Sequence, residues 1–192
     1  GVLYGWGKNE RYQLGLGSDS NNRCMAEGQH IEVVDPESGT ELHVRKVASG
    51  NNHSACLTDC GGVFAWGRNF GLERSVDGEL TGNVVDVVQP TLIRGLPTST
   101  TQANDVRVVD ISCGSHHLAM LLSDGSVYGV GISTDLKQPL LDEAVCMLPP
   151  NDIISQSAGR PTSDGSDVSG ADTTGVRQFT SSFDRTLIIP RD

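Results

Sequence analysis

The sequence predicts an all-β protein built from a repeated unit, and three observations support that fold class. The stretch VRKVASGNNHSACLTDCGGVFAWGRN at 44–69 recurs in the same order at 106–131 as VRVVDISCGSHHLAMLLSDGSVYGVG. Glycine is abundant, at 23 residues, which is typical of many short strands joined by turns. No useful length of the chain shows the apolar period of a helix. Because internal repetition fixes an architecture before any local assignment, we interpret the chain as repeats that carry insertions.

Each repeat is expected to supply about four short strands, and the first two meet at a glycine-histidine corner. Gly50 and His53 form this Gly-x-x-His corner in one copy, and Gly114 and His117 form it in the next. Because the histidines recur at equivalent positions, we assign them a structural role, with a ring nitrogen bridging backbone groups between strands. An Asp/Gly turn follows each second strand, and such turns supply the positive φ angles of tight hairpins.

The strand after that turn combines apolar and aromatic residues and occurs three times, at 3–7, 63–67 and 127–131. Its copies read LYGWG, VFAWG and VYGVG, with bulk on both faces except at the small residue in the middle. A strand that is apolar on both sides is covered on both sides, as in sheets stacked on neighbouring sheets. Trp6 and Trp66 are therefore predicted to lie in the core. The residues that mark the repeat are Trp6, Gly7, Gly50, His53, Trp66, Gly67, Gly114 and His117.

The third copy of the repeat is degenerate. The stretch VRQFTSSFDRTLII at 176–189 has Ser182 and Arg185 at the positions of the marker glycine and histidine, and it keeps its apolar ends. Both ends of the chain align with the Asp124-Gly125 turn of the middle copy, so we expect three complete repeats cut from a longer protein. The predicted sequence repeats are 1–61, 62–124 and 125–192, and together they form one segment, 1–192.

Three insertions separate the repeated stretches. Residues 18–42 are acidic and polar, and residues 72–105 contain an apolar run at 89–97 that is bounded by prolines. Residues 151–175 are rich in Ser, Asp, Thr and Gly and hold almost no large apolar side chains. This last insertion is expected to be disordered or a mobile surface loop.

Composition excludes several classes of partner and environment. The net charge of −10 repels phosphate backbones, so this segment is not expected to bind nucleic acid directly. No run of about 18 apolar residues exists that would cross a membrane. The five cysteines lack regular spacing, which argues against a secreted disulfide framework. We therefore expect an intracellular protein, in the cytoplasm or the nucleus.

Each candidate site for chemistry has a simpler structural interpretation. His53, Cys56 and Cys60 could be drawn as a zinc cluster, yet Cys56 aligns with the apolar Met120 and a structural zinc needs a fourth ligand. The glycine pairs near the start of the chain do not complete a phosphate-binding loop, and no nucleophile motif of a hydrolase is present. We therefore predict no catalytic residue, no metal, no cofactor and no enzyme activity. Zinc and a catalytic histidine are the less favoured alternatives, and metal analysis of the purified protein tests the first.

These motifs resemble the repeat of the regulator of chromosome condensation family. The resemblance rests on GVFAWG-x-N at 62–69, on QLG-x-G at 13–17 and on V-x-x-V/I-x-x-G-x-x-H, and it covers the whole chain in three copies. Members of that family form β-propellers, commonly seven-bladed, in which each blade mixes strands of two repeats. The resemblance implies a partial β-propeller of about three blades, with the remaining blades supplied by the parent chain. Unpaired blade edges at both ends would then favour self-association, which size-exclusion chromatography tests.

Two functions follow from these observations. The first is a protein-interaction scaffold, because loops on a rigid repeat fold carry binding and the insertions are long. The second, implied by the resemblance, is a guanine-nucleotide exchange factor for a Ran-type small GTPase, an activity expected only of the full propeller. Exchange members contact the GTPase through loop residues just before the repeat histidine and just after the Trp-Gly strand. The matching positions for partner binding here are Glu10, Asn52, His116 and Asp184.

The chain departs from the family pattern at several marker positions. Val130 stands where the strand carries tryptophan, and Ser182 and Arg185 replace the corner glycine and histidine. The Gln-Leu-Gly motif is absent from the second and third repeats. These departures weigh against a fully typical exchange surface and favour the scaffold.

Overall fold

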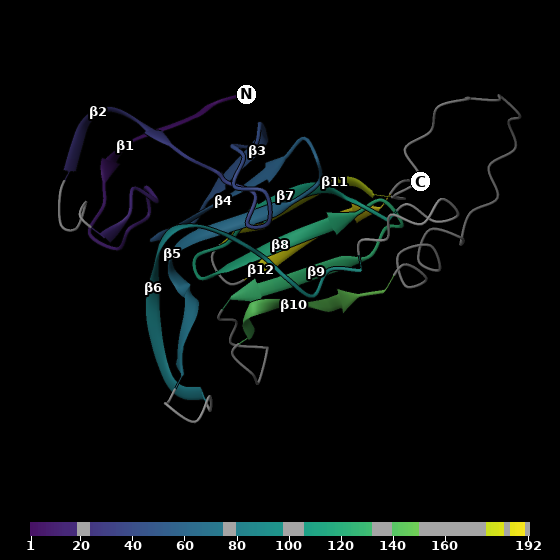
Figure 1. Ribbon diagram of the computed structural model, residues 1–192. Coiled ribbons are helices and arrows are strands. Elements are labelled where there is room, and N and C mark those ends of the chain that lie inside the picture. Colours follow the sequence, from purple (N-terminus) through teal and green to yellow (C-terminus); the bar gives the residue numbers. More distant parts are fainter. Residues whose placement is uncertain are drawn as a thin grey trace, which may run out of the picture.

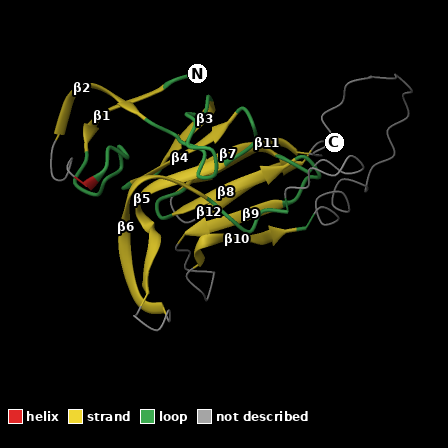
Figure 2. Ribbon diagram, in the orientation of Figure 1, coloured by secondary structure: helices red, strands yellow, loops and turns green. Residues whose placement is uncertain are grey.

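A computed structural model describes residues 1–18, 24–74, 80–97, 106–131, 140–149, 176–182 and 185–190 of the chain. Strands and turns make up nearly all of this described part (Figure 2), so the all-β prediction is confirmed. The predicted loop at 151–175 and the predicted contact residue Asp184 lie outside the described residues. No helix in these ranges is long and apolar enough to cross a membrane.

The strands of the described part form four antiparallel sheets, which we call blades. Blade A is β1-β2, blade B is β3-β4-β5-β6, blade C is β7-β8-β9-β10 and blade D is β11-β12. The strands are β1 (Leu3–Lys8), β2 (Cys24–Ile31), β3 (Val44–Ser49), β4 (His53–Thr58), β5 (Val63–Arg74), β6 (Leu80–Leu92), β7 (Val108–Cys113), β8 (His117–Leu122), β9 (Val127–Gly131), β10 (Leu140–Leu148), β11 (Val176–Ser182) and β12 (Arg185–Pro190).

The repeated sequence accounts for the two four-stranded blades. In blade B, β4 pairs with β5 so that His53 lies opposite Gly67. In blade C, β8 pairs with β9 in the same register, with His117 opposite Gly131. Each of these blades therefore combines two strands before an Asp/Gly turn with two strands after it, as the family resemblance implies. Blades B and C lie side by side (Figure 1), which is the arrangement of neighbouring blades in a β-propeller.

Blades A and D are complementary half blades. The strand β1 carries the Trp-Gly sequence that β5 carries in blade B, so β1 and β2 are the second half of a blade. The degenerate third copy folds as the hairpin β11-β12, in which Ser182 pairs with Arg185. Gly50 and His53 form the equivalent corner of β3 and β4, with the Gly50 amide donating to the His53 carbonyl over 2.9 Å. Blade D is therefore the first half of a blade.

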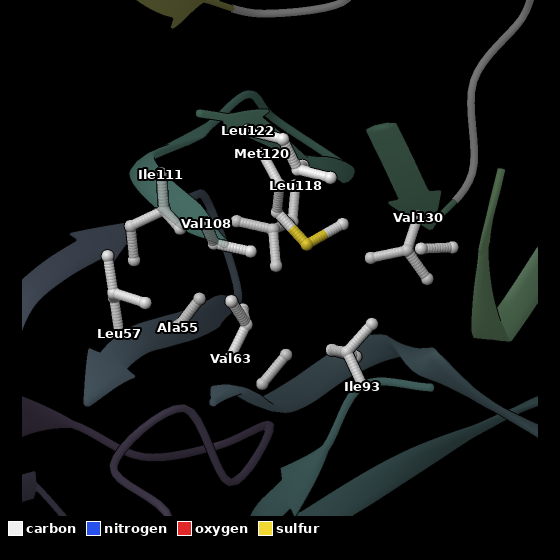
Figure 3. Close-up of a cluster of buried hydrophobic side chains, with 12 residues drawn as sticks. Ala55, Leu57, Val63, Ile93, Val108, Ile111, Leu118, Met120, Leu122 and Val130 are labelled. Atoms are coloured by element: carbon white, nitrogen blue, oxygen red, sulfur yellow. The ribbon is translucent and has the colours of Figure 1, made fainter. Parts of the chain in front are cut away.

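The larger core fills the space between blades B and C. Figure 3 shows Ala55, Leu57 and Val63 of blade B pointing toward side chains of β7 and β8. Burial of one such large aliphatic side chain is worth about 1.5–3 kcal/mol relative to exposure, so this cluster is a major source of stability. Its buried members are Ala55, Leu57, Val63, Ala65, Ile93, Val108, Ile111, Leu118, Met120, Leu122, Val130 and Ala144.

A second core joins blade A to blade B. Ile31 and Val33 of the N-terminal part pack there with Cys56, Phe64 and Trp66 of blade B. Because successive side chains of a strand point to opposite faces, Cys56, Phe64 and Trp66 face blade A. Their neighbours Ala55, Leu57, Val63 and Ala65 face blade C. The prediction that this strand is covered on both sides is confirmed for β5.

Polar contacts also join the first strands of blades B and C. The guanidinium of Arg45 on β3 donates from Nη2 to the Val108 carbonyl of β7 over 3.2 Å. The next residue, Lys46, forms an ion pair with Asp110 of β7. Both charged groups of that pair are partly exposed, so its contribution to stability is small, about 0–1 kcal/mol.

Two of the predicted insertions contain strands. The 18–42 stretch holds β2, and the 72–105 stretch holds the end of β5 and the whole of β6. Most residues of β2 are exposed, because β2 is the outer strand of its blade. An exposed strand has no apolar alternation, so the sequence pattern that predicts strands does not detect it.

The prediction that both tryptophans lie in the core is correct for Trp66 and wrong for Trp6. Trp66 is buried against blade A, whereas Trp6 is exposed together with Tyr4 on the same face of β1. Blade A packs against blade B through its other face, and no described strand covers the face of Trp6. Equivalence within the repeat fixes which way a side chain points and does not supply the neighbour that buries it.

Candidate interaction face

The glycine-histidine corners lie at one end of the blades, which we call the corner face. The β3–β4 corner at 50–52 and the β7–β8 corner at 114–116 lie at this end. The chain after β1 lies there too, since Gly7 near the end of β1 is equivalent to Gly67, the residue opposite His53. The Asp/Gly turns, at 59–62 and 123–126, lie at the opposite end.

The marker glycines Gly67 and Gly131 hold the backbone of the corner face in place. Gly67 has a φ of 93°, and a Cβ atom on it would lie 2.5 Å from the carbonyl oxygen of Asn52. The amide of Arg68 donates to that same oxygen over 2.8 Å. Gly131 repeats the arrangement, with a Cβ position 2.6 Å from the His116 carbonyl oxygen. Only glycine fits this left-handed, crowded position, so each corner has a fixed course.

The fixed corners present polar side chains of both charges. His116 and Asn51 are exposed, and Asn52 is partly exposed. Glu10 is exposed and forms a surface ion pair with Lys8 at 2.9 Å. An exposed ion pair of this kind contributes little stability, so either side chain can break it and bind a partner protein with a small loss of free energy. These groups offer donors, acceptors and charges for binding, and none of them is arranged as a nucleophile with a base.

The loop after β1 is fastened to blade B through one carbonyl oxygen. The carbonyl of Gln13 accepts from the Ser54 hydroxyl at 2.7 Å and from the Trp66 indole Nε1 at 2.9 Å. Within the loop, the buried side chain of Asn9 accepts from the Leu14 amide at 2.9 Å. The loop that carries Glu10 is therefore fixed relative to the β3–β4 corner.

The Gln-Leu-Gly motif has its explanation at Gly15. This residue has a φ of 69°, and a Cβ atom on it would lie 2.9 Å from the Trp66 ring and 3.1 Å from Pro90. Two residues later, the Gly17 amide donates to the Val88 carbonyl of β6 over 3.0 Å. The motif therefore lets the chain pass close to Trp66 of blade B, so its role is in packing.

His53 is buried beneath the corner face and stays neutral. Burial lowers the pKa of His53 from 6.5 to about 4, and a hydrogen bond to the His117 backbone opposes this shift only in part. The ring lies against Gly50, and the Gly114 carbonyl of the next corner lies close to the same glycine. A buried neutral imidazole between two corners has a structural task, which fits the assignment made from the repeat.

The geometry of β4 argues against a zinc site on His53, Cys56 and Cys60. His53 and Cys56 are three residues apart on one strand, so their side chains point to opposite faces. Burial raises the pKa of the Cys56 thiol to about 12, which disfavours the thiolate that zinc requires. Among the described residues, no group of three or more His, Cys, Asp or Glu side chains could hold a metal.

A cavity of about 540 Å³ opens at the opposite end of blade B. Asp35 and Glu37 line one part of it, and Arg94 and Arg107 line another. Hydrogen bonds from the backbone amides of Ser38 and Glu37 lower the pKa of Asp35, so this carboxylate is charged and already bound within its own turn. No sequence pattern signals this cavity, because its residues come from four separate segments, at 35–42, 60–64, 92–96 and 106–107.

The corner face brings together three of the four predicted contact residues, Glu10, Asn52 and His116. Asp184 lies outside the described residues. Sequence reasoning missed Arg11, which is exposed beside Glu10 and pairs with Asp86 of β6 at 3.7 Å. The repeat predicts the loop that contains Arg11, because this loop follows the first Trp-Gly strand. It does not predict the ion pair, because Asp86 lies in the 72–105 insertion, which has no equivalent in the other repeats.

Comparison with protein families gives matches at the repeats described above. The Regulator of chromosome condensation (RCC1) repeat matches residues 1–57, and a second model of the same repeat matches residues 44–71 and 108–135. Among solved structures, Prp20p from Saccharomyces cerevisiae aligns with a TM-score of 0.62 over 97% of this chain and 39% of that chain, at 15% identity. This structural likeness concerns the fold.

Two curated relatives show how differently such repeats are used. Human HERC6, named a probable E3 ubiquitin-protein ligase, is 33% identical over 67% of this chain and 11% of its own length. The guanine nucleotide exchange factor SRM1 of Saccharomyces cerevisiae is 30% identical over 68% of this chain and 24% of its own length. The chain thus spans less than a quarter of the length of either relative. Together with the repeat matches and the blades, these similarities show that the chain belongs to the regulator of chromosome condensation repeat family, as a partial β-propeller.

Proposed function

We propose that this chain is a protein-binding propeller segment whose corner face contacts another protein inside the cell. The observation that carries the proposal is the equivalence of two corners. Asn52 and His116 are displayed from adjacent blades by the same glycine-dependent backbone. Rigid, repeated display of unlike polar side chains suits recognition, because little ordering is needed when the partner binds.

Site-specific photo-crosslinking tests the location of the binding surface. A photoreactive phenylalanine derivative at position 116 or 52 is expected to give a defined crosslinked product in a cell extract. The matched control is position 38, on the exposed loop at 35–40 beside the cavity at the opposite end. Equal crosslinking at 38 and 116 would place the binding surface elsewhere and contradict the proposal.

A guanine-nucleotide exchange factor for a Ran-type GTPase is the second candidate function. Two similarities favour it: SRM1 is named an exchange factor, and Prp20p, whose fold this chain resembles, binds Gsp1p and histones. An exchange factor stabilises the nucleotide-free GTPase and displaces nucleotide and Mg²⁺, which needs a large complementary surface. Val130 in place of the strand tryptophan weighs against a fully typical surface.

A nucleotide-release assay separates the two functions. The probe is a Ran-type GTPase loaded with fluorescent GDP, and release is followed with and without the full propeller that contains this chain. Binding without faster release supports the scaffold alone. Faster release that is lost in Asn52→Ala and His116→Ala, and kept in Ser38→Ala, supports exchange.

A further inference from the structure

The cavity of about 540 Å³ at the turn end of blade B has walls that hydrogen bonds hold in place. The loop before β3 is closed by the Leu42 amide, which donates to the Val33 carbonyl over 2.7 Å. After β6, the Ile93 amide donates to the Val63 carbonyl of β5 over 2.8 Å. The residues that line the cavity all lie between 35 and 107, so its walls come from the interior of the chain.

Two arginines in this lining project from backbone that blade C holds. The Arg94 carbonyl accepts from the Ala144 amide over 2.8 Å, and the Arg107 carbonyl accepts from the Ser123 amide over 2.8 Å. Both arginines are exposed, and neither forms an ion pair with another described residue. Two guanidinium groups on a fixed backbone, without an acidic partner in the described part, suit the binding of an anion.

The repeat shows that the fold does not require an arginine at position 107. The equivalent residue one repeat earlier is His43, whose carbonyl accepts from the Asp59 amide over 2.9 Å. The Arg107 carbonyl accepts from the Ser123 amide in the same way. Since the backbone bond forms with either side chain, the guanidinium of Arg107 is available for a task other than folding.

The turn beside the cavity also differs from its equivalent in a way that favours an anion. In blade C this turn carries Asp124, whose carboxylate accepts from the Ser126 amide at 2.9 Å and from the Ser126 hydroxyl at 2.6 Å. In blade B the equivalent residue is Cys60, and it lines the cavity. A thiol thus replaces a carboxylate that would repel an anionic ligand.

Most of the remaining lining is apolar. Leu42, Leu92, Leu96 and Val106 line the cavity and are partly exposed. Apolar surface next to two cations favours a ligand that is itself amphipathic, because burial of that surface against an alkyl chain is favourable. The volume also lies within the range of about 300–1,000 Å³ that small-molecule pockets have.

Two acidic residues limit the charge of such a ligand. The carboxylate of Asp35 accepts from the amides of Glu37 and Ser38, each over 2.8 Å, so its charge is stabilised within its own turn. Glu37 is exposed and lines the same cavity. A ligand with two negative charges meets more repulsion from these carboxylates than a ligand with one. A carboxylate carries one charge and matches the donor geometry of a guanidinium.

We propose that this cavity binds an amphipathic monocarboxylate, with the carboxylate at Arg94 and Arg107 and the alkyl chain on the apolar lining. The site lies at the opposite end of the blades from the corner face. It therefore does not rest on the protein-binding function proposed above, and it adds a small-molecule ligand to the same blades.

Alkylation of Cys60 tests the location of the site, because this thiol is exposed and lines the cavity. The full-length protein that contains this chain is treated with iodoacetamide, a neutral reagent, and peptide mass spectrometry gives the rate at each cysteine. Octanoate at about ten times its dissociation constant is expected to slow alkylation of Cys60 about tenfold. Cys24 and Cys146 are exposed outside the cavity and should keep their rates. An unprotected Cys60 would overturn the proposal.

A series of ligands tests the chemistry, with dissociation constants measured by calorimetry. Hexanoate is two methylenes shorter than octanoate and is expected to bind about fifteenfold more weakly, since each buried methylene is worth about fourfold. Octanol lacks the carboxylate and is expected to bind about tenfold more weakly. Equal affinity of octanol and octanoate would exclude a role for the arginines. Equal affinity of acetate and octanoate would exclude a role for the apolar lining, and either result overturns the proposal.

Substitutions to glutamine test the charges. Arg94→Gln and Arg107→Gln are each expected to raise the dissociation constant of octanoate about tenfold. Glu37→Gln is expected to lower it about twofold, because a like charge is removed. The matched control is Arg45→Gln, since Arg45 is exposed and does not line the cavity. Shifts in opposite directions with the same new side chain cannot come from a general loss of folding. An unchanged constant in both arginine variants would contradict the assignment.

Other occupants of the cavity give different results. If another segment of a longer chain fills it, Cys60 of the full-length protein is alkylated slowly without octanoate, and octanoate changes nothing. If a second copy covers it, protection of Cys60 rises with protein concentration in the absence of octanoate. Either result overturns the proposal. Asn52→Ala and His116→Ala are expected to keep octanoate binding, so a failure of the corner-face proposal is distinguishable from a failure of this one.

Discussion

The indole ring of Trp66 lies so close to Gly15 that a Cβ atom on Gly15 would be 2.9 Å from Cδ1 and Nε1 of the ring. One contact thus joins the loop of the N-terminal half blade to the core of blade B. It makes the glycine of one repeat and the tryptophan of the next a single structural unit. The stability of the corner face depends on that unit, because the same loop carries Glu10.

Replacement of Gly15 by alanine is expected to lower the free energy of unfolding by about 2–4 kcal/mol. The left-handed φ of 69° costs about 1–2 kcal/mol for a residue with Cβ, and the clash with the ring adds a similar amount. The control is Gly39→Ala, because Gly39 has a φ of 70° with nothing within 4 Å of its Cβ position. Urea denaturation measures both variants, and equal losses would show that the ring contact has no cost.

The two donors on the Gln13 carbonyl are expected to be coupled. Ser54→Ala or Trp66→Phe alone leaves the oxygen with one donor, and the double variant leaves it with none. Because an unsatisfied buried acceptor costs more than one lost bond, the double loss should exceed the sum of the single losses by about 1 kcal/mol. A double-mutant cycle in urea measures this, and Ser126→Ala in blade C replaces Ser54→Ala as the additive control. Additivity in the first cycle would mean that the donors act independently.

The free energy of unfolding is expected to decrease as the pH is lowered, because His53 titrates. Its pKa is 6.5 when unfolded and about 4 when folded, so between these values the unfolded chain binds the extra proton. Stability is therefore complete above pH 6.5 and declines as the pH falls toward 4, by about 3 kcal/mol at most. Urea midpoints at pH 7.5 and pH 5 measure the decline. His53→Asn should flatten this slope, and an unchanged slope in that variant would assign the decline to other groups.

The five cysteines are expected to react with a thiol reagent in two classes. Cys24, Cys60 and Cys146 are exposed and should react quickly in the native protein. Burial raises the pKa of Cys56 and of Cys113 to about 12, so both thiols lack thiolate character, and Cys56 is also closed to solvent. A colorimetric thiol assay should give three fast groups and two more only in denaturant. Fast reaction of all five would show that the blades open readily.

The repeat in the sequence predicted the blades because each marker residue has a local geometric task. Gly67 is required by the carbonyl of Asn52, and His53 fills the space beside Gly50, so such residues recur wherever the geometry recurs. The family resemblance placed Asn52 and His116 at equivalent corners and Glu10 in the loop after the first Trp-Gly strand. That these residues contact a partner stays a prediction, because exposed residues on a loop are not constrained by packing within the chain.

The sequence could not predict features that depend on a neighbour. Trp6 and Trp66 are equivalent by alignment, yet only Trp66 has a sheet in front of it among the described residues. Likewise, β2 is a strand because it pairs with β1, and its exposed side chains carry no apolar alternation. The cavity beside Asp35 and Arg94 needs four segments to meet, which local patterns do not specify.

Because β4 places Leu57 in one hydrophobic core and Cys56 in the other, blade B contributes to both cores. A destabilising substitution in β4 is therefore expected to weaken both cores, whereas one in blade A weakens only the core between blades A and B. Opening of β4 therefore has to disrupt both cores, so its backbone is expected to be among the last to open. Amide exchange measures this, and the amides of β4 are expected to be among the slowest of the described strands because β4 contributes to two cores at once.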